Sequence, residues 1–368
     1  MKKKIFYDGI YSGHHSSYAK NIVMSTSNSK LLVNKNMIHK YEDIPKEKID
    51  LLDCVDPQSF KLTPIGWIVN MIKIYMKKKA NYKNDCMYFL YGDSIVFYLL
   101  FYLLLTRQRI FVTIHWANAV VPIEKYRSKL HAGLRRLKFK CFTIVCKSAN
   151  VIVHGDFTKG KLTQKYGEIN IYSIPYGIEK DNAREQALHL KRINENGRPK
   201  ILFFGGIRRD KGIEKLAELA SISPEYDFIV AGKPNDYNKE TIRNMFRGLN
   251  NVKLYLGFIK DEEVKELFLN VNVLILPYEY YFSGQSGPLT IATIYSVPVV
   301  GTDVGDMGDD IKKHNLGEIV ETNHPHLLKQ AIEIVLKNGE SFYRNNHNKF
   351  YYDSLWDKVG RLIDSIVK

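Results

Sequence analysis

The chain has 368 residues, of which 45% are hydrophobic, and at the usual domain size this predicts a globular protein of two domains. Lys and Arg outnumber Asp and Glu by 54 to 39, which gives a net charge of +15. The four cysteines contain no CxxC pair, so they predict reduced thiols and argue against a disulfide framework or a zinc site on Cys141 and Cys146.

Near the N-terminus no segment reads as a secretory signal, because residues 1–10 pass from three lysines directly into a short strand-like run. The longest apolar run, Ile95–Leu105, is about half of the roughly 20 residues that span a bilayer. It predicts a buried helix. We therefore expect a cytoplasmic protein.

The positive charge is concentrated in the first half of the chain. Residues 1–180 contain 29 Lys and Arg against 13 Asp and Glu, while residues 181–368 contain 25 against 26. Such a concentration of positive charge attracts nucleic acid, an anionic membrane or an anionic substrate. Because no zinc finger, RNA-binding sheet signature or basic repeat is present, nucleic acid is disfavoured.

Two clusters hold many of these cations: Lys73 with Lys77, Lys78 and Lys79, and the stretch 125–140. In the second cluster apolar and basic residues interleave at approximately helical spacing. A helix of this kind lies on acidic lipid or forms an ordinary solvated helix face, and the sequence leaves both open. The basic first half favours an anionic membrane surface as a partner.

Short apolar runs alternate with helical patterns through both halves, which predicts two α/β domains with Rossmann-like parallel sheets. The strands expected in the first half are 4–7, 87–91, 110–114, 151–154 and 171–174. Those expected in the second half are 201–204, 228–231, 252–256, 273–276, 297–301 and 318–320. The join falls in the charge-rich stretch between Gly177 and Pro199.

At the start of the second half, residues 203–212 join a strand to a helix through Gly205, Gly206 and the cations Arg208, Arg209 and Lys211. Backbone N–H groups and the helix dipole attract anions at such a turn. Solvated cations are the alternative, but a helix N-terminus disfavours positive charge unless an anion binds. The segment therefore predicts a site for a nucleotide diphosphate.

Further along, Ser286-Gly287-Pro288 precedes an apolar helix at 289–296 and a strand at 297–301. Together with residues 203–212, this resembles the nucleotide-sugar half of a GT-B glycosyltransferase, family 4 (group 1) in particular. The resemblance implies an acceptor-side domain at 1–180 and a nucleotide-sugar domain at 181–350. The pattern starting at Tyr352 implies that residues 351–368 form a closing helix that packs back on the N-terminal domain.

The resemblance assigns roles in the first half. Gly13 lies in the family's glycine loop that faces the donor phosphates, with His14 and His15 on the acceptor side. His115 resembles a strand-end histidine near the transferred sugar, although a single histidine at a strand end is more often structural. Residues 174–177 resemble the segment that enters the interdomain linker.

In the second half, Arg208 and Lys211 resemble the pair that neutralises the departing nucleoside diphosphate, with Arg209 as a substitute and Gly205 in the turn. The spacing is tighter than the commoner pattern, and Gly206 stands where that pattern has its Arg. Most relatives also have two glutamates where this chain has Ser283 and Ile291. The hydrogen bonds of donor binding are therefore expected from other residues: Glu279, Gln285, Ser286 and the amides of Gly287, Leu289 and Thr290.

The resemblance implies a retaining, metal-independent hexosyltransferase that uses a nucleotide-diphosphate sugar and no cofactor. The acceptor would be a glycan or a lipid-linked sugar of a cell-surface polysaccharide, at the inner membrane face. No Asp-x-Asp signature is present, and the aspartates at 303, 306, 309 and 310 are interpreted as loop and cap residues. A nucleotide-sugar epimerase of the same architecture and a catalytically silent binding protein remain open.

Overall fold

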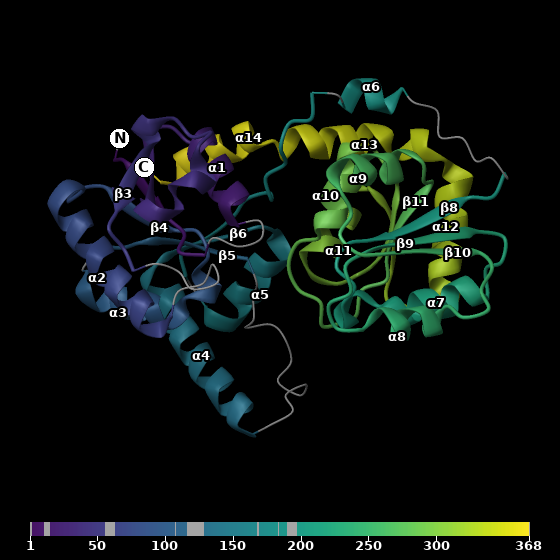
Figure 1. Cartoon of the computed structure of the whole chain (residues 1–368), viewed down its shortest axis with the longest axis horizontal. Helices are drawn as coiled ribbons and strands as arrows, with labels where there is room; N and C mark the ends of the chain where they lie inside the picture. The colour runs from purple at the N-terminus through teal and green to yellow at the C-terminus, as the bar shows by residue number, and fades with distance from the viewer. Residues whose placement is uncertain are drawn as a thin grey trace. The chain divides into compact units, whose positions relative to one another are not determined.

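The computed structural model describes residues 2–10, 15–55, 63–106, 108–115, 129–167, 169–182, 184–189 and 197–367. It divides into two compact units (Figure 1). Unit 1 comprises Met1–Glu179 and Ser354–Lys368, and unit 2 comprises Lys180–Asp353.

Unit 1 is built on a parallel sheet with the strand order β3-β2-β1-β4-β5-β6-β7. The strands are β1 (Lys4–Tyr7), β2 (Ser29–Asn34), β3 (Ile49–Leu52), β4 (Cys86–Phe89), β5 (Phe111–Ile114), β6 (Asn150–Val153) and β7 (Ile171–Ser173). Most are short and almost wholly apolar because helices cover both faces of a parallel sheet.

The two faces of this sheet are covered by different helices. The first core packs α2 (Pro64–Asn81), α3 (Val96–Leu105), α4 (Lys129–Ser148) and α5 (Asp156–Tyr166) on one face. The second packs α1 (His15–Ser25) and α14 (Trp356–Ile366) on the other. Short 3₁₀ helices at Lys35–Tyr41, Lys46–Lys48 and Gly92–Ser94 complete the unit.

Unit 2 contains a parallel sheet with the order β10-β9-β8-β11-β12-β13. Its strands are β8 (Lys200–Phe204), β9 (Asp227–Gly232), β10 (Val252–Leu256), β11 (Val273–Leu276), β12 (Val299–Thr302) and β13 (Gly317–Val320). One face packs α7 (Ile213–Ser221), α8 (Lys239–Met245) and α12 (Pro325–Asn338), and the other packs α9 (Asp261–Leu269), α10 (Gly287–Ile294) and α11 (Gly305–His314). Helices α6 (Arg184–Leu188) and α13 (Glu340–Asp353) and a 3₁₀ turn at Arg209–Lys211 complete it.

The predicted α/β class with two Rossmann-like sheets is confirmed, and so is the closing helix, because α14 packs in unit 1. The sequence analysis missed β2 and β3. Its prediction of a buried helix at Ile95–Leu105 is wrong for one side of α3. Leu99 and Tyr102 face the core, but the Leu104 side chain is 85% exposed.

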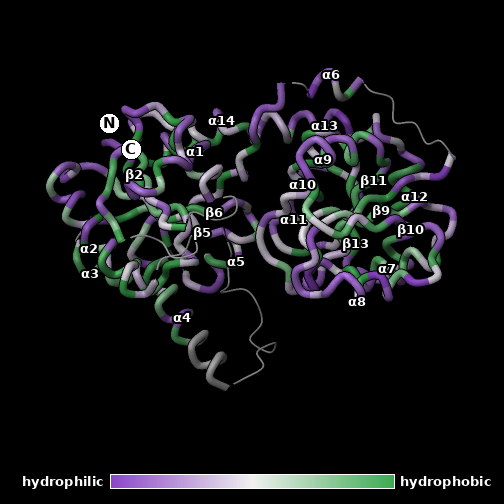
Figure 2. Tube along the Cα trace, viewed as in Figure 1, coloured by the Kyte–Doolittle hydropathy of each residue, from purple (hydrophilic) through white to green (hydrophobic). Residues whose placement is uncertain are grey.

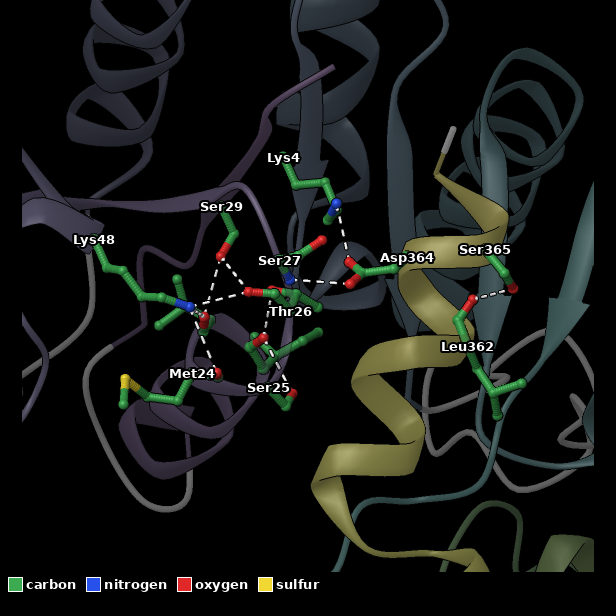
Figure 3. Close-up of polar contacts among 12 residues, drawn as sticks. Lys4, Met24, Ser25, Thr26, Ser27, Ser29, Lys48, Leu362, Asp364 and Ser365 are labelled. Carbon is green, nitrogen blue, oxygen red and sulfur yellow. Dashed lines mark hydrogen bonds and ion pairs between the residues drawn. The ribbon is translucent and has the colours of Figure 1, made fainter. Parts of the chain in front are cut away.

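A polar network holds α14 in unit 1 (Figure 3). The Lys4 ammonium, fully buried at the start of β1, forms an ion pair with Asp364 of α14 at 2.9 Å. The other carboxylate oxygen of Asp364 accepts a bond from the Ser27 amide at 3.0 Å. Lys48 donates to the carbonyls of Val23 and Thr26 at the end of α1, as expected for a cation at a helix C-terminus.

Over the described ranges, none of the helices combines the length and the apolar character needed to cross a membrane.

Candidate functional site

The strand order of unit 2 creates a switch point between β8 and β11. From β8 the chain proceeds outward through β9 and β10, whereas from β11 it proceeds the other way through β12 and β13. The loops that follow β8 and β11 therefore leave the carboxyl edge of the sheet in opposite directions. Open α/β sheets bind their ligands in the crevice at such a point.

Glycines allow these two loops to approach closely. Gly212, with φ of 68°, lies so near the other loop that an added Cβ would be 1.9 Å from the Pro277 carbonyl oxygen. No other residue type fits there without moving the backbone. The Glu279 amide donates to the Asp210 carbonyl at 3.0 Å, which ties the two loops together.

Lys211 is the most unusual side chain of this edge, because it is only 7% exposed. Its ammonium lies 5.2 Å from the centre of the Tyr278 ring. Within the described parts of the chain it has no carboxylate partner and no hydrogen-bond acceptor. The buried side chain thus brings a positive charge that no described carboxylate neutralises to this edge of the sheet, and this favours an anionic ligand.

The N-terminus of α10 lies next to this ammonium. A Cβ added to Gly205 would be 3.3 Å from Lys211 Nζ and 3.3 Å from Pro288 Cγ in the first turn of α10. The first amides of an α-helix have no partner within the helix, and they attract anions together with the helix dipole. A cation and a helix N-terminus thus converge beside Gly205.

Arg208 and Arg209 have different surroundings. The Arg208 guanidinium forms two bonds to the Asp210 carboxylate, at 2.9 and 2.7 Å. Burial alone would lower the pKa of Arg208, but the bonds to Asp210 outweigh it and the net direction is upward. Arg209 is exposed, and its guanidinium carbon lies 5.7 Å from the centre of the Tyr237 ring. Lys211 is therefore the cation best prepared for a new anion.

Ser286 and the turn before α10 are held by Tyr278. The Tyr278 hydroxyl and the Ser286 hydroxyl are 3.1 Å apart, and both side chains are buried. The expectation that Thr290 offers an open amide is wrong, because this amide donates to the Ser286 carbonyl as the first bond of α10. Gly287 and Leu289 come earlier in that turn. A Cβ added to Gly287 meets no heavy atom within 4 Å.

Gln285 is bonded within unit 2, where its side chain contacts the Asp310 carboxyl of α11. Burial, together with the neighbouring Asp306, raises the pKa of Asp310 to about 7. The Gln285 bond acts in the opposite direction. Gln285 thus connects the turn before α10 with the first turns of α11.

Glu279 lies beside the same switch point, half-buried, where its carboxylate accepts a bond from Asn323 at 3.0 Å. Asn323 also donates to the Pro277 carbonyl, at 3.2 Å. Ile291, at one of the two positions where relatives carry glutamate, packs instead against the apolar core of unit 2. Of these residues, only Glu279 offers a carboxylate.

In unit 1, polar and aromatic side chains follow the ends of successive strands. The His115 ring stacks on Tyr91 at a centroid distance of 3.9 Å, and its Nε2 lies 3.0 Å from the Leu90 carbonyl. The His15 ring contacts Tyr91 at 3.7 Å, and its Nδ1 pairs with the buried Asp8 carboxylate at 2.8 Å. The structure thus brings His15 and His115 to one aromatic ring.

Two further buried groups belong to this edge of unit 1. Burial lowers the pKa of His154 to about 4, so its imidazole is neutral at pH 7 and bonds to the Tyr18 hydroxyl at 2.8 Å. Burial raises the pKa of Asp93 to about 6, and this carboxylate accepts a bond from the His115 amide. Asp93 therefore fixes the backbone that presents His115.

Sequence reasoning missed several residues of the two edges: Asp8, Tyr91, Asp93, His154, Tyr278 and Asn323. Four of them stand within four residues of the end of β1, β4 or β6, and this position was the available signal. Two predicted residues, Gly13 and His14, lie outside the described residues. Within the described part, no cluster of three His, Cys, Asp or Glu side chains suits a metal ion.

Comparison with known proteins agrees with this architecture. Residues 185–350 match the family model described as glycosyl transferases group 1. An uncharacterized glycosyltransferase of Methanocaldococcus jannaschii is 25% identical over 176 residues, which cover 46% of this chain and 44% of the relative. The chain thus spans less than half the length of this curated relative.

Solved structures match over nearly the whole chain. Sucrose-phosphate synthase of Thermosynechococcus elongatus superposes with a TM-score of 0.73 at 14% identity, covering 99% of this chain and 98% of that one. HepE of Anabaena, solved in complex with UDP and glucose, gives 0.69 at 13% identity and covers 99% of both chains. The chain therefore has the GT-B fold, and its residues 185–350 match the model of the glycosyl transferases group 1 family.

Proposed function

We propose that this protein transfers a sugar from a nucleotide-diphosphate donor to a glycan or lipid-linked acceptor of a cell-surface polysaccharide. The observation that carries the proposal is Lys211, whose side chain is buried and whose ammonium, without a carboxylate partner in the described residues, lies beside the first turn of α10. A diphosphate is the anion that suits this site. HepE, which has the same fold, was solved with UDP and glucose, so uridine nucleotides are the first donors to test.

In the proposed reaction, the bond between the sugar C1 and the β-phosphate oxygen breaks, and its electron pair remains on the phosphate. The acceptor hydroxyl oxygen bonds to C1 on the face that the phosphate leaves, and its proton passes to the departing phosphate oxygen. Lys211, Arg208 and the amides of Gly287 and Leu289 stabilise the charge that develops on the leaving phosphate. These groups supply the electrostatics without a metal, and the anomeric configuration is retained.

We assign donor binding to unit 2 and the acceptor side to unit 1. Glu279, held by Asn323, binds donor-sugar hydroxyls, and Ser286 positions the first turn of α10 through Tyr278. In unit 1, His14 and His15 take the acceptor side, while His115 acts near the transferred sugar and Gly13 keeps the role at the donor phosphates that the resemblance implies. A lipid-linked acceptor places the enzyme at the cytoplasmic face of a membrane.

Thermal shift against a panel of nucleotide sugars tests the function directly. A ligand at 100 times its Kd adds about 2.7 kcal/mol to the free energy of unfolding. We expect one nucleotide sugar and its free nucleoside diphosphate to stabilise the protein, and Lys211→Ala to lose most of that shift. A panel without any stabilising nucleotide would contradict the proposal.

The turn at Gly287 provides a second test of donor binding. Because nothing occupies the space beside this residue, Gly287→Val should fold normally while its side chain covers the amides of the first turn. A hydrogen bond to a charged group contributes about 1.5–3 kcal/mol, so we expect the donor Kd to rise about tenfold or more. Calorimetric titration measures it.

Gly287→Ala is the matched control, since it adds a single carbon to the same space and should weaken binding less. An unchanged Kd for Gly287→Val would show that the phosphates bind elsewhere.

A further inference from the structure

Three neighbouring helices of unit 1 contain no acidic residue. Helices α2, α3 and α4 lie on the same face of the sheet, with α3 packed against both of the others (Figure 1). Together they contain no Asp or Glu and ten Lys and Arg, of which Lys78 is buried and Lys77 pairs with Asp50 of β3. Helices on the surface of a soluble protein usually mix both signs of charge, so this layer is specialised for an anionic partner.

The outer side of α2 carries a continuous apolar stripe. Ile65, Ile68, Ile72 and Met76 are all exposed, Ile65 by 75% and Met76 by 63%. Their spacing of three and four residues places them on one side of the helix. The stripe ends at the exposed Lys79, whereas Trp67, Met71 and Ile74 face the core.

The other two helices repeat this arrangement. On α3, Phe97 and Leu104 are exposed two turns apart. On α4, the exposed residues alternate between apolar and basic side chains at helical spacing: Leu137, Lys140, Ile144 and Lys147. Figure 2 shows hydrophobic segments in α2 and α3. Large apolar side chains are thus presented outward on each helix of the layer.

We infer that the outer face of α2, α3 and α4 binds the surface of a membrane rich in anionic phospholipid. Large exposed apolar side chains among lysines suit the boundary between headgroups and acyl chains, and the lack of carboxylates removes repulsion from lipid phosphates. Nucleic acid would use the cations but not the apolar stripes. The inference rests on the proposed function only in that a lipid-linked acceptor lies at that surface.

Flotation of the full chain with vesicles tests this surface. We expect recovery with vesicles that contain phosphatidylglycerol, little recovery with phosphatidylcholine alone, and a loss of binding at high salt. Replacing both Ile65 and Met76 with Ser should lower the partition coefficient at least about tenfold, because both side chains lose their burial in lipid. Replacing Lys140 and Lys147 with Ser should lower it about fivefold per lysine.

The matched control replaces two exposed apolar residues of unit 2, Phe258 and Ile334, with Ser. This double variant should bind vesicles as the wild type does. Equal partitioning of the Ile65/Met76 variant and the wild type would overturn the inference. The inference would also be overturned if light scattering showed a wild-type dimer and a monomeric Ile65/Met76 variant, because the face would then bind a second copy of the chain.

Thermal shift and flotation together test the membrane surface and the proposed function independently. Nucleotide-sugar thermal shifts of the Ile65/Met76 variant should equal those of the wild type, because both substitutions lie on the exposed side of α2, and neither residue is assigned to donor binding. Vesicle binding by a protein that no nucleotide sugar stabilises would refute the proposed function and retain the membrane surface. Stabilisation by a nucleotide sugar without vesicle binding would support the proposed function and refute the membrane surface.

Discussion

Lys211→Ala should lower turnover by about 10²–10³ at saturating donor, which corresponds to about 2.7–4 kcal/mol of transition-state stabilisation. In the proposed reaction, the charge on the leaving β-phosphate develops where the Lys211 ammonium and the first turn of α10 converge. Arg208 is bound to Asp210 and Arg209 is exposed, so neither guanidinium is held where it would take over the role of Lys211. Release of the nucleoside diphosphate under saturating donor and acceptor measures the effect.

Stability distinguishes this role from a structural one. The Lys211 ammonium has no carboxylate partner in the described residues, so Lys211→Met, which keeps the packing of the buried side chain and breaks no ion pair, should leave the unfolding temperature nearly unchanged. Lys215→Ala is the matched control, since that lysine lies on α7 and pairs with Glu218. Arg208→Ala should lower turnover less than Lys211→Ala does, because Arg208 is already bound to Asp210. Near wild-type turnover in Lys211→Ala would refute the assignment.

Most strands of both sheets could be predicted because a parallel strand covered on both faces is a short apolar run with clear ends. Of the two strands that were missed, β2 is buried and fits this pattern, whereas β3 does not. β3 is an edge strand in which Asp50 is half-buried and Leu51 is exposed, so its sequence does not resemble a buried strand. α3 is uniformly apolar, which predicted a buried helix, although Phe97 and Leu104 are exposed on its outer side.

The site was predictable only where its residues are neighbours in the sequence. Gly205, Arg208 and Lys211 stand in one turn, so their joint use as an anion site could be inferred from the chain itself. The Gln285–Asp310 contact and the Tyr278–Ser286 pair depend on how loops from different strands meet. The order of strands in the sheet determines which loops come into contact, and residue spacing does not reveal this order.

Asp364→Ala should destabilise unit 1 by about 3 kcal/mol, at the low end for broken buried ion pairs because this carboxylate is 21% exposed. The substitution leaves the fully buried Lys4 ammonium without its partner and removes the acceptor of the Ser27 amide. For a unit of this size, we expect the unfolding temperature to fall by about 6–12 °C in calorimetry. Asp357→Ala, on the exposed side of α14, should cost less than about 1 kcal/mol.

The pair should also respond asymmetrically to mutation and to pH. Lys4→Met should cost less than Asp364→Ala, because the remaining carboxylate still reaches solvent and Ser27, whereas the Lys4 ammonium reaches neither. Burial alone would raise the pKa of Asp364, but the bonds from Ser27 and Lys4 outweigh it and lower the pKa. The stabilisation is therefore complete above the ordinary carboxylate range and is lost as the pH falls through the lowered pKa. A difference between wild type and Asp364→Ala that grows in acid would contradict this account of how α14 is held.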